Sequence, residues 1–237
     1  PGLAPRAASC HARAMNAAFR PPASARPAPV LLAIVGLCAG LEVAFTLTGL
    51  PAVGLDALRR TGIVYGAFWS HLLTDWDPVF PGQRLTMFVT YAFVHAGLLH
   101  VLFNMLLMVQ LGREAVARLG QAGFVLLFGV TAAGGGAAFA LLNGSEAPML
   151  GASGVVFGLF GATIWWDIQR RRVAGVSLAQ PLRLIAGLVV MNVLLWFLVA
   201  GMLAWEAHLG GFVAGMAFAR IVTPSLRHRH RPRTGMR

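Results

Sequence analysis

The sequence predicts an all-α membrane protein, built as a bundle of six transmembrane helices with both termini in the cytoplasm. Of its 237 residues, 57% are hydrophobic and only 11% are charged, and the mean hydropathy is +0.71. Soluble domains carry about 25% charged residues, so this depletion indicates a chain that lies in a lipid bilayer. Apolar runs of about 20 residues, the length that spans a bilayer, also recur along the chain.

Six apolar runs are long enough for a helix to cross the hydrocarbon core. They lie near residues 30–50, 93–112, 122–142, 149–167, 182–203 and 205–223. The second run begins early, near Leu85, and is too long for one straight crossing. We therefore expect its first part, LTMFVTYAF, at the membrane interface or in a loop. The chain then divides into a membrane domain over 29–223, which contains an external interfacial loop over 51–92.

Both ends of the chain are predicted to be basic cytoplasmic tails. Residues 1–28 are rich in Pro, Ala and Arg without an apolar period, which is typical of a disordered segment. Residues 224–237 form a second basic tail. A cleaved signal peptide is not expected, because the first apolar run is long and further spans follow it.

The distribution of arginine predicts how the bundle is oriented. Most arginines lie in the two tails and in the loops around Arg113 and around 170–172, whereas the opposite loops hold few arginines and more carboxylates. Arginine-rich loops face the cytoplasm, so spans two, four and six run from outside to inside. This topology accounts for the net charge of +11, and nucleic acid is not an expected partner.

Polar residues inside the spans are candidates for function, since a polar group in hydrocarbon is costly. His100, Ser153 and His208 come from three different spans, each 13 to 15 residues from the inner end of its helix. At about 1.5 Å per residue, all three lie about 10 Å below the outer surface of the bilayer. Asn104 shares a helix face with His100, whereas His95 is rotated away from that face.

Glycine stripes accompany two of these candidates. Gly154 and Gly158 are four residues apart on span four, and Gly211 and Gly215 repeat this spacing on span six. Stripes of small residues let helix backbones approach closely. Packing the two faces together would bring the serine of span four near the histidine of span six.

A serine close to a histidine indicates a nucleophile and its general base. Asp167 lies at the far end of the serine's helix, and Glu206 lies on a different side of its helix from His208. A Ser–His dyad is therefore expected rather than a triad. His100 and Asn104 lie at a depth suited to holding the oxyanion, together with backbone N–H groups near the start of span four.

Three segments in chain order, HAGLLHVLFN (95–104), GASG (151–154) and AHLGGFVAG (207–215), resemble the rhomboid intramembrane serine proteases. The resemblance covers roughly residues 30–223 and implies a rhomboid-like bundle of six helices. It also implies that the chain is a serine endopeptidase that cleaves peptide bonds in or near transmembrane segments of membrane proteins.

The resemblance implies a role for each matching residue. Ser153 matches the nucleophile and His208 the general base. His100 and Asn104 match the oxyanion hole, and Gly151 matches the glycine beside it. Residues expected to be structural near the site are His95, Phe157, Gly154, Gly211, Gly215 and Arg84.

Two positions depart from the family pattern. Gln83 precedes Arg84 where many rhomboids have Trp, so the anchoring of the first external loop is expected to differ. Phe157 stands where many relatives have a Tyr whose ring packs on the catalytic histidine. Phe keeps the ring and loses only the hydroxyl, so we expect activity to survive.

The expected mechanism starts with a substrate helix that approaches laterally and unwinds near small or helix-breaking residues. No metal or organic cofactor is implied, and the expected partners are transmembrane protein substrates and the lipid bilayer. The many Ala and Gly residues, and the absence of Lys, suggest a GC-rich bacterial genome. The expected location is the bacterial inner membrane, with several membrane passes.

Other interpretations compete with this one. Ser153 alone would be interpreted as a helix-packing serine, and His208 alone as a structural or interhelical hydrogen-bonding histidine. Asn192 is interpreted as a structural hydrogen-bonding residue without a named partner. A non-enzymatic chaperone, as among inactive relatives, would have lost the serine or histidine. A metal site or proton relay of His95, His100 and His208 lacks Cys or carboxylate companions. A transporter would show internal repeats, and none is detected.

Overall fold

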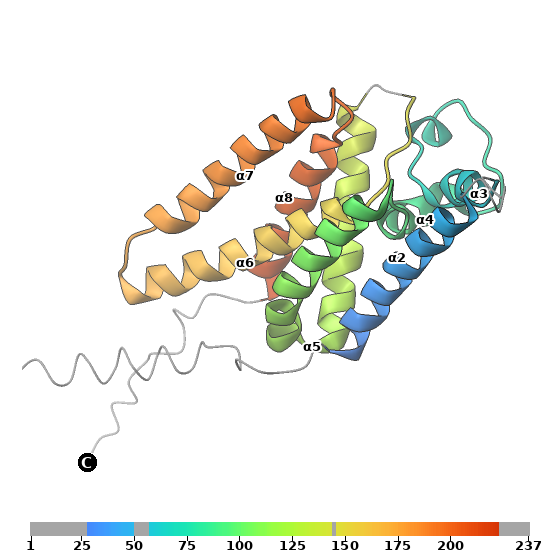
Figure 1. The fold of residues 1–237 in the computed structure, drawn as a ribbon. Coiled ribbons are helices and arrows are strands. Elements are labelled where there is room, and N and C mark those ends of the chain that lie inside the picture. The colour runs from blue at the N-terminus through green and yellow to red at the C-terminus, as the bar shows by residue number, and fades with distance from the viewer. Residues whose placement is uncertain (1–27, 50–56, 144–145, 223–237) are drawn as a thin grey trace, which may run out of the picture.

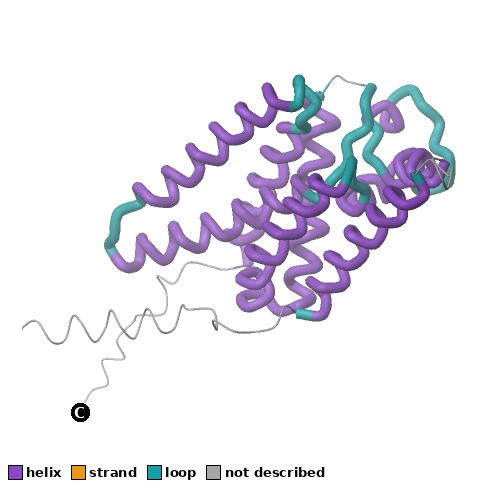
Figure 2. Tube along the Cα trace, in the orientation of Figure 1, coloured by secondary structure: helices purple, strands orange, loops and turns teal. Residues whose placement is uncertain are grey.

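Every regular element of the described residues is helical. The computed structural model describes residues 28–49, 57–143 and 146–222. Figure 2 draws these residues as helices joined by loops. One isolated bridge pairs Phe68 with Met149. The predicted tails, 1–28 and 224–237, lie outside the described residues apart from Ala28.

The helices are arranged in Figure 1 with α3 and α4 at one end of the bundle and α7 at the other side. Their bounds are α2 Pro29–Thr48, α3 Ala57–Gly66, η1 Ser70–Leu73, α4 Gln83–Thr90, η2 Tyr91–Phe93, α5 Leu98–Leu142, α6 Ser153–Ala174, α7 Ala179–Leu198 and α8 Trp205–Val222.

α5 contains the second and third predicted spans. Its backbone leaves the helical conformation at Gly120, with φ 73° and ψ 176°, a region that glycine adopts at little cost. The two halves fold back on each other, as Figure 1 shows. The predicted division between 93–112 and 122–142 is therefore confirmed, although the first half begins at Leu98.

The segment predicted as an external loop, 51–92, contains more helix than expected. From Ala57 onward it forms α3, η1 and α4, and η2 completes it at Phe93. Gln83 is buried at the start of α4. Its amide accepts a hydrogen bond from Val79 N (2.7 Å) and donates one to the Val64 carbonyl (2.8 Å). This amide anchors the segment at the position where Trp was expected.

The predicted bounds of span four, 149–167, are wrong at both ends. Met149 is extended and exchanges backbone hydrogen bonds of 2.8 and 2.9 Å with Phe68. Gly151 has φ +114°, which excludes it from a helix, so α6 begins only at Ser153. At the other end α6 continues to Ala174, where arginines in the last turn favour the helix terminus.

α8 packs against both α6 and α5 (Figure 1), and it meets α6 backbone to backbone. A Cβ added at Gly211 would overlap the carbonyl of Gly154, and one at Gly215 would overlap the carbonyl of Gly158. Backbones approach this closely only where no side chain intervenes. The prediction that the glycine stripes bring spans four and six together is confirmed.

Three described helices are long and apolar enough to cross a membrane, namely α2, α5 and α7. α5 contains two of the predicted spans. α6 and α8 bury many of their residues inside the bundle and carry polar or basic residues near their ends. The number of six spans and the cytoplasmic position of both termini stay predictions.

Candidate active site

Ser153 is the first residue of α6 and is partly exposed. The chain reaches it through Gly151, whose N–H donates to the Tyr91 carbonyl at 2.9 Å. The first N–H groups of a helix have no carbonyl partner within that helix. The hydroxyl of Ser153 and these N–H groups therefore lie at the same helix end, where they could face one reacting carbonyl.

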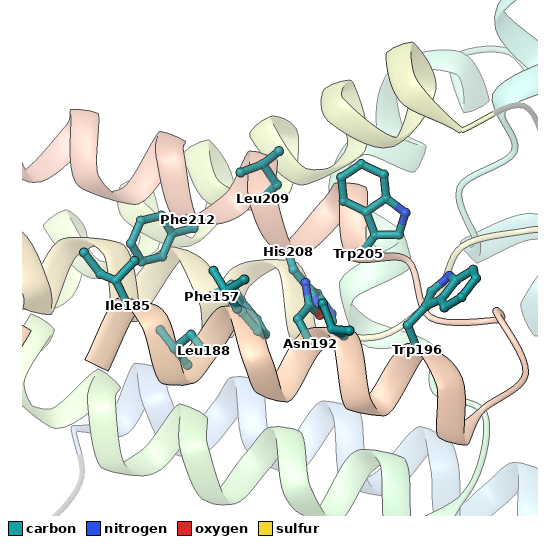
Figure 3. Close-up of a pocket in the computed structure, with 11 residues that line it drawn as sticks. Phe157, Ile185, Leu188, Asn192, Trp196, Trp205, His208, Leu209 and Phe212 are labelled. Carbon is teal, nitrogen blue, oxygen red and sulfur yellow. The ribbon is translucent and has the colours of Figure 1, made fainter. Parts of the chain in front are cut away.

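His208 lies in the first turns of α8, and it is only 3% exposed. Its ring stacks on Phe157, with centroids 4.2 Å apart and planes 3° from parallel (Figure 3). Its neighbour Ala207 contacts the residue after Ser153, because a Cβ added at Gly154 would lie 3.3 Å from the Ala207 carbonyl oxygen. The α6–α8 contact thus brings the beginning of both helices together, with the serine and the histidine beside it.

The two ring nitrogens of His208 have different surroundings. Nδ1 lies 2.7 Å from Oδ1 of Asn192 in α7. Because an amide oxygen can only accept, Nδ1 carries the proton and donates it, and Nε2 keeps its lone pair. Nε2 is buried, and no described residue forms a hydrogen bond with it. This is the protonation pattern that a general base requires.

His100 lies against the chain just before Ser153. A Cβ added at Gly151 would lie 2.7 Å from Nε2 of His100, so only glycine leaves room for the ring. The N–H of Ala96 donates to Nδ1 of His100 at 3.3 Å. Since Nδ1 accepts, the neutral ring carries its proton on Nε2, beside Gly151. His100 can therefore donate a hydrogen bond near the start of α6.

Asn104 lies one turn after His100 in α5 and is buried. Its side-chain Nδ2 donates to the backbone carbonyl of His100 at 2.9 Å. An amide nitrogen has two protons, so one donor remains after this bond.

Both ring nitrogens of His95 form hydrogen bonds with backbone groups. Nδ1 lies 3.3 Å from the Phe93 carbonyl, and Nε2 accepts from the N–H of Ala152 at 3.3 Å. Its ring centroid is 5.2 Å from that of His100. His95 thus ties the residue before Ser153 to the segment that leads into α5.

A buried ion pair that the sequence reasoning missed supports this segment. Glu42 of α2 is 1% exposed, and its Oε1 lies 2.6 Å from Nη2 of Arg59 in α3. Nη1 of the same arginine donates to the His95 carbonyl at 3.2 Å. A carboxylate inside an apolar span is itself a signal that it has a partner, and this signal could have found Glu42.

The remaining charged candidates have partners other than His208. Arg84 donates to the Trp76 carbonyl at 3.0 Å in the 51–92 segment. Asp167 pairs with Arg171 at 2.6 Å, and Glu206 accepts from Asn143 at 2.9 Å. Within the described ranges, no cluster of three or more His, Cys, Asp or Glu residues is arranged to hold a metal ion.

An apolar pocket of about 450 Å³ opens beside His208, between α6, α7 and α8 (Figure 3). Phe157, Leu188 and Phe212 line it with apolar side chains, and Asn192 and His208 supply polar atoms. The pocket keeps much of α7 apart from α8, so the Asn192–His208 hydrogen bond crosses between two loosely packed helices.

Comparisons with known proteins agree with the resemblance seen in the sequence. The family model described as Rhomboid domain matches residues 82–225, from α4 to beyond α8. Two similar proteins named Rhomboid protease GlpG come from Yersinia pestis (strain Pestoides F) and Yersinia pseudotuberculosis serotype O:3 (strain YPIII). Each is 29% identical over 192 residues, which cover 81% of this chain and 62% of that protein.

A third protein of the same name, from Salmonella choleraesuis (strain SC-B67), is 29% identical over 212 residues, covering 86% of this chain and 67% of that protein. The chain therefore spans about three fifths of the length of the Yersinia relatives that it matches. The matched part of this chain includes Ser153 and His208.

Proposed function

The chain belongs to the rhomboid family of multi-pass integral membrane proteins, and we propose that it is an intramembrane serine endopeptidase. Its substrates are membrane proteins that it cleaves in or near their transmembrane segments. The observation that carries the proposal is the His208 imidazole, buried beside the start of α6 with Nδ1 bonded and Nε2 without a partner among the described residues.

The proposed nucleophile is Ser153 and the proposed general base is His208. Nε2 takes the hydroxyl proton as Oγ attacks the substrate carbonyl, and the resulting imidazolium then protonates the leaving amine. Water hydrolyses the acyl-enzyme with the same histidine as base. A buried Nε2 that no described residue bonds suits this role, because no other donor competes for its lone pair.

The developing oxyanion is stabilised by donors at the start of α6. Nε2–H of His100, the second amide proton of Asn104 and backbone N–H groups of the first helical turn are the proposed donors. Gly151 supports this proposal because it leaves room for the His100 ring beside the chain. His95 and Phe157 have positioning roles, the first on the chain before Ser153 and the second on the face of the base.

The proposed topology has six helices that cross the bilayer and both termini in the cytoplasm. The relatives are bacterial proteins, so the proposed location is a bacterial inner membrane. Substrate helices enter laterally from the bilayer and unwind near the site. The reaction requires no metal or organic cofactor.

The test uses purified protein in liposomes with a labelled transmembrane substrate, and a fluorophosphonate that labels activated serines. Ser153→Ala and His208→Ala should each reduce cleavage by about 10³-fold or more, since members of a nucleophile–base pair act as a unit. Ser177→Ala, an exposed serine in the loop between α6 and α7, is the matched control and should cleave like the parent.

Fluorophosphonate labelling should be lost in Ser153→Ala and kept in Ser177→Ala. Equal cleavage by the parent and both site variants would rule out the dyad. A folded parent that neither cleaves nor becomes labelled would favour the non-enzymatic interpretation instead.

A further inference from the structure

Asn192 is a polar side chain in the middle of a membrane helix. Between Leu184 and Leu198 it is the only side chain in α7 that carries an amide or a charge. A polar group inside the bilayer is costly in free energy, so it is usually hydrogen-bonded or part of a functional site. Its side chain points to His208 in the close-up of the pocket (Figure 3).

The hydrogen bond between these residues determines which nitrogen of His208 holds the proton. Oδ1 of Asn192 lies 2.7 Å from Nδ1 and can only accept, so it selects the tautomer with the proton on Nδ1. The stacking of Phe157 determines the plane of the ring. The Phe157 stacking therefore determines the tilt of the imidazole ring. The Asn192 hydrogen bond determines the rotation of the ring within its plane and which nitrogen carries the proton.

Serine and cysteine peptidases use a third side chain for this purpose, either a carboxylate or an asparagine. No carboxylate among the described residues is bonded to His208. Asp167 is paired with Arg170 and Arg171 at the far end of α6, and Glu206 is bonded to Asn143. Among the described residues, Asn192 is the side chain that occupies this third position.

We propose that Asn192 is a positioning residue for His208, which accepts the Nδ1 proton and keeps Nε2 available for the proton of Ser153. The proposal rests on the proposed peptidase function. The amide oxygen also continues to accept from Nδ1–H when His208 becomes an imidazolium, so the bond persists through proton transfer.

The location of Asn192 on α7 ties the geometry of the base to this helix. Only Pro181 and Leu188 of α7 are buried, and the pocket lies between the helix and its neighbours. A shift of α7 would therefore carry the amide away from His208 more easily than a shift of α8 would carry the ring away from α6.

The experiment compares Asn192→Leu, which keeps similar volume without an acceptor, with Asn192→Asp, which keeps the acceptor. Asn192→Leu should lower kcat by about 10- to 100-fold with KM nearly unchanged, less than the 10⁴-fold loss known for an inverted tautomer in a triad. Asn192→Asp should recover most of this loss. Val193→Ala, which lines the same pocket without a polar contact, is the control and should retain the parent kcat.

A second measurement reads the tautomer without any reaction. In protein labelled with ¹⁵N-histidine, the imidazole shifts of His208, assigned by comparison with His208→Gln, should report the proton on Nδ1 in the parent and in Asn192→Asp. Asn192→Leu should show a mixture or the opposite tautomer. Thermal unfolding in detergent checks that each variant is folded.

The outcomes separate the two proposals. If the parent is active and Asn192→Leu keeps both kcat and the Nδ1–H tautomer, the positioning role is overturned while the peptidase function stands. The role is likewise overturned if Asn192→Asp is as impaired as Asn192→Leu. If the parent itself shows no Ser153-dependent activity, both proposals fail together.

Discussion

α8 and α7 both flank α6, yet they pack against it in opposite ways. α8 presents glycines, so its backbone lies directly on the backbone of α6 at Gly211 and Gly215. α7 presents large apolar side chains, most of which stay exposed, and only Pro181 and Leu188 are buried. The base therefore has its Cα on a closely packed helix and its hydrogen-bond acceptor on a loosely packed one.

The physics of packing inside a bilayer explains this difference. Lipid tails are as apolar as leucine, so large apolar side chains gain little by leaving lipid for another helix. Close van der Waals contact between backbones does provide a gain, and small residues make it available. The comparison predicts that substitutions on α8 cost stability, whereas substitutions on α7 are tolerated unless they touch Asn192.

The largest effect is expected from a glycine-to-leucine substitution on α8, compared with the same substitution on α7. In Gly211→Leu the new side chain meets the Gly154 carbonyl, which cannot move without displacing α6. Overpacking typically lowers the free energy of unfolding by about 1–3 kcal/mol. Because the clash here is with backbone, the loss should exceed this range, and little of the variant should fold. Thermal unfolding in detergent measures it.

The matched control for this prediction is Gly187→Leu on α7. A Cβ at Gly187 has no heavy atom within 4 Å, so its melting temperature should stay within a few degrees of the parent. If both variants melt alike, the contrast between the two helices is incorrect.

A second prediction extends the comparison to the other flank of the site, where α2 and α3 support the segment before α5. Arg59→Ala leaves the buried carboxylate of Glu42 without its cation. Breaking a buried pair costs about 3–5 kcal/mol, and because Arg59 is partly exposed we expect a smaller loss of about 2 kcal/mol. Cleavage should fall as well, since the arginine also bonds the carbonyl of His95.

Its control is Arg60→Ala, which removes an exposed arginine from the same helix. Chemical or thermal unfolding should find this variant within about 0.5 kcal/mol of the parent. An equal loss in both variants would mean that the charge of α3 matters and the ion pair does not.

A third prediction concerns Gln83, which takes the place of the expected Trp. Gln83→Leu removes both hydrogen bonds of the buried amide and leaves the Val79 N–H and the Val64 carbonyl unpaired. A fully buried unpaired group costs about 1–3 kcal/mol. Because Val64 and Val79 are exposed, water can reach these two groups, and the loss per group should lie below this range. Limited proteolysis of the 57–93 region and thermal unfolding should both detect the loss.

Arg84→Ala serves as the control for this anchor. It removes a single hydrogen bond in an exposed setting, so its unfolding should differ little from that of the parent. Greater damage from Arg84→Ala than from Gln83→Leu would transfer the anchoring role to the arginine.

The smallest expected effect concerns the ring that stacks on the base. Phe157→Leu keeps an apolar side chain and loses the parallel contact with His208. Aromatic pairs contribute about 0.5–1.5 kcal/mol beyond their buried area, so kcat should fall by up to about tenfold. Phe160→Leu, whose ring meets Phe157 edge-on, is the control and should leave kcat nearly unchanged. No change in Phe157→Leu would leave the orientation of the base to Asn192 alone.

Much of the architecture could be predicted from the sequence because its signals are local. Apolar run length predicted α2, both halves of α5, α6, α7 and α8, and the gap around Gly120 predicted the fold-back within α5. It did not predict the short helices α3 and α4. Glycine spacing predicted the α6–α8 contact. The start of α6 at Ser153 was not predicted, since apolar character continues through 149–152 and hides the extended pairing with Phe68.

The residue types of the site could be predicted from the sequence, but the hydrogen bonds and ion pairs between them could not. Asn192 carried a polar signal, but its partner lies 16 residues away on another helix. Glu42 and Arg59 are 17 residues apart and lie on different helices, α2 and α3. Such pairs depend on the rotation of each helix about its axis, which hydropathy along the chain does not encode.

The sequence by itself determined that this chain enters a membrane, where its long apolar helices lie to within a few residues and which of them approach closely, because length, hydropathy and small-residue spacing act within each helix. Only the tertiary structure decided which nitrogen of His208 holds the proton, which ring nitrogen of His100 is free to donate and where the buried carboxylate of Glu42 finds its cation. These are hydrogen bonds between elements, and their geometry exists only once the helices have packed.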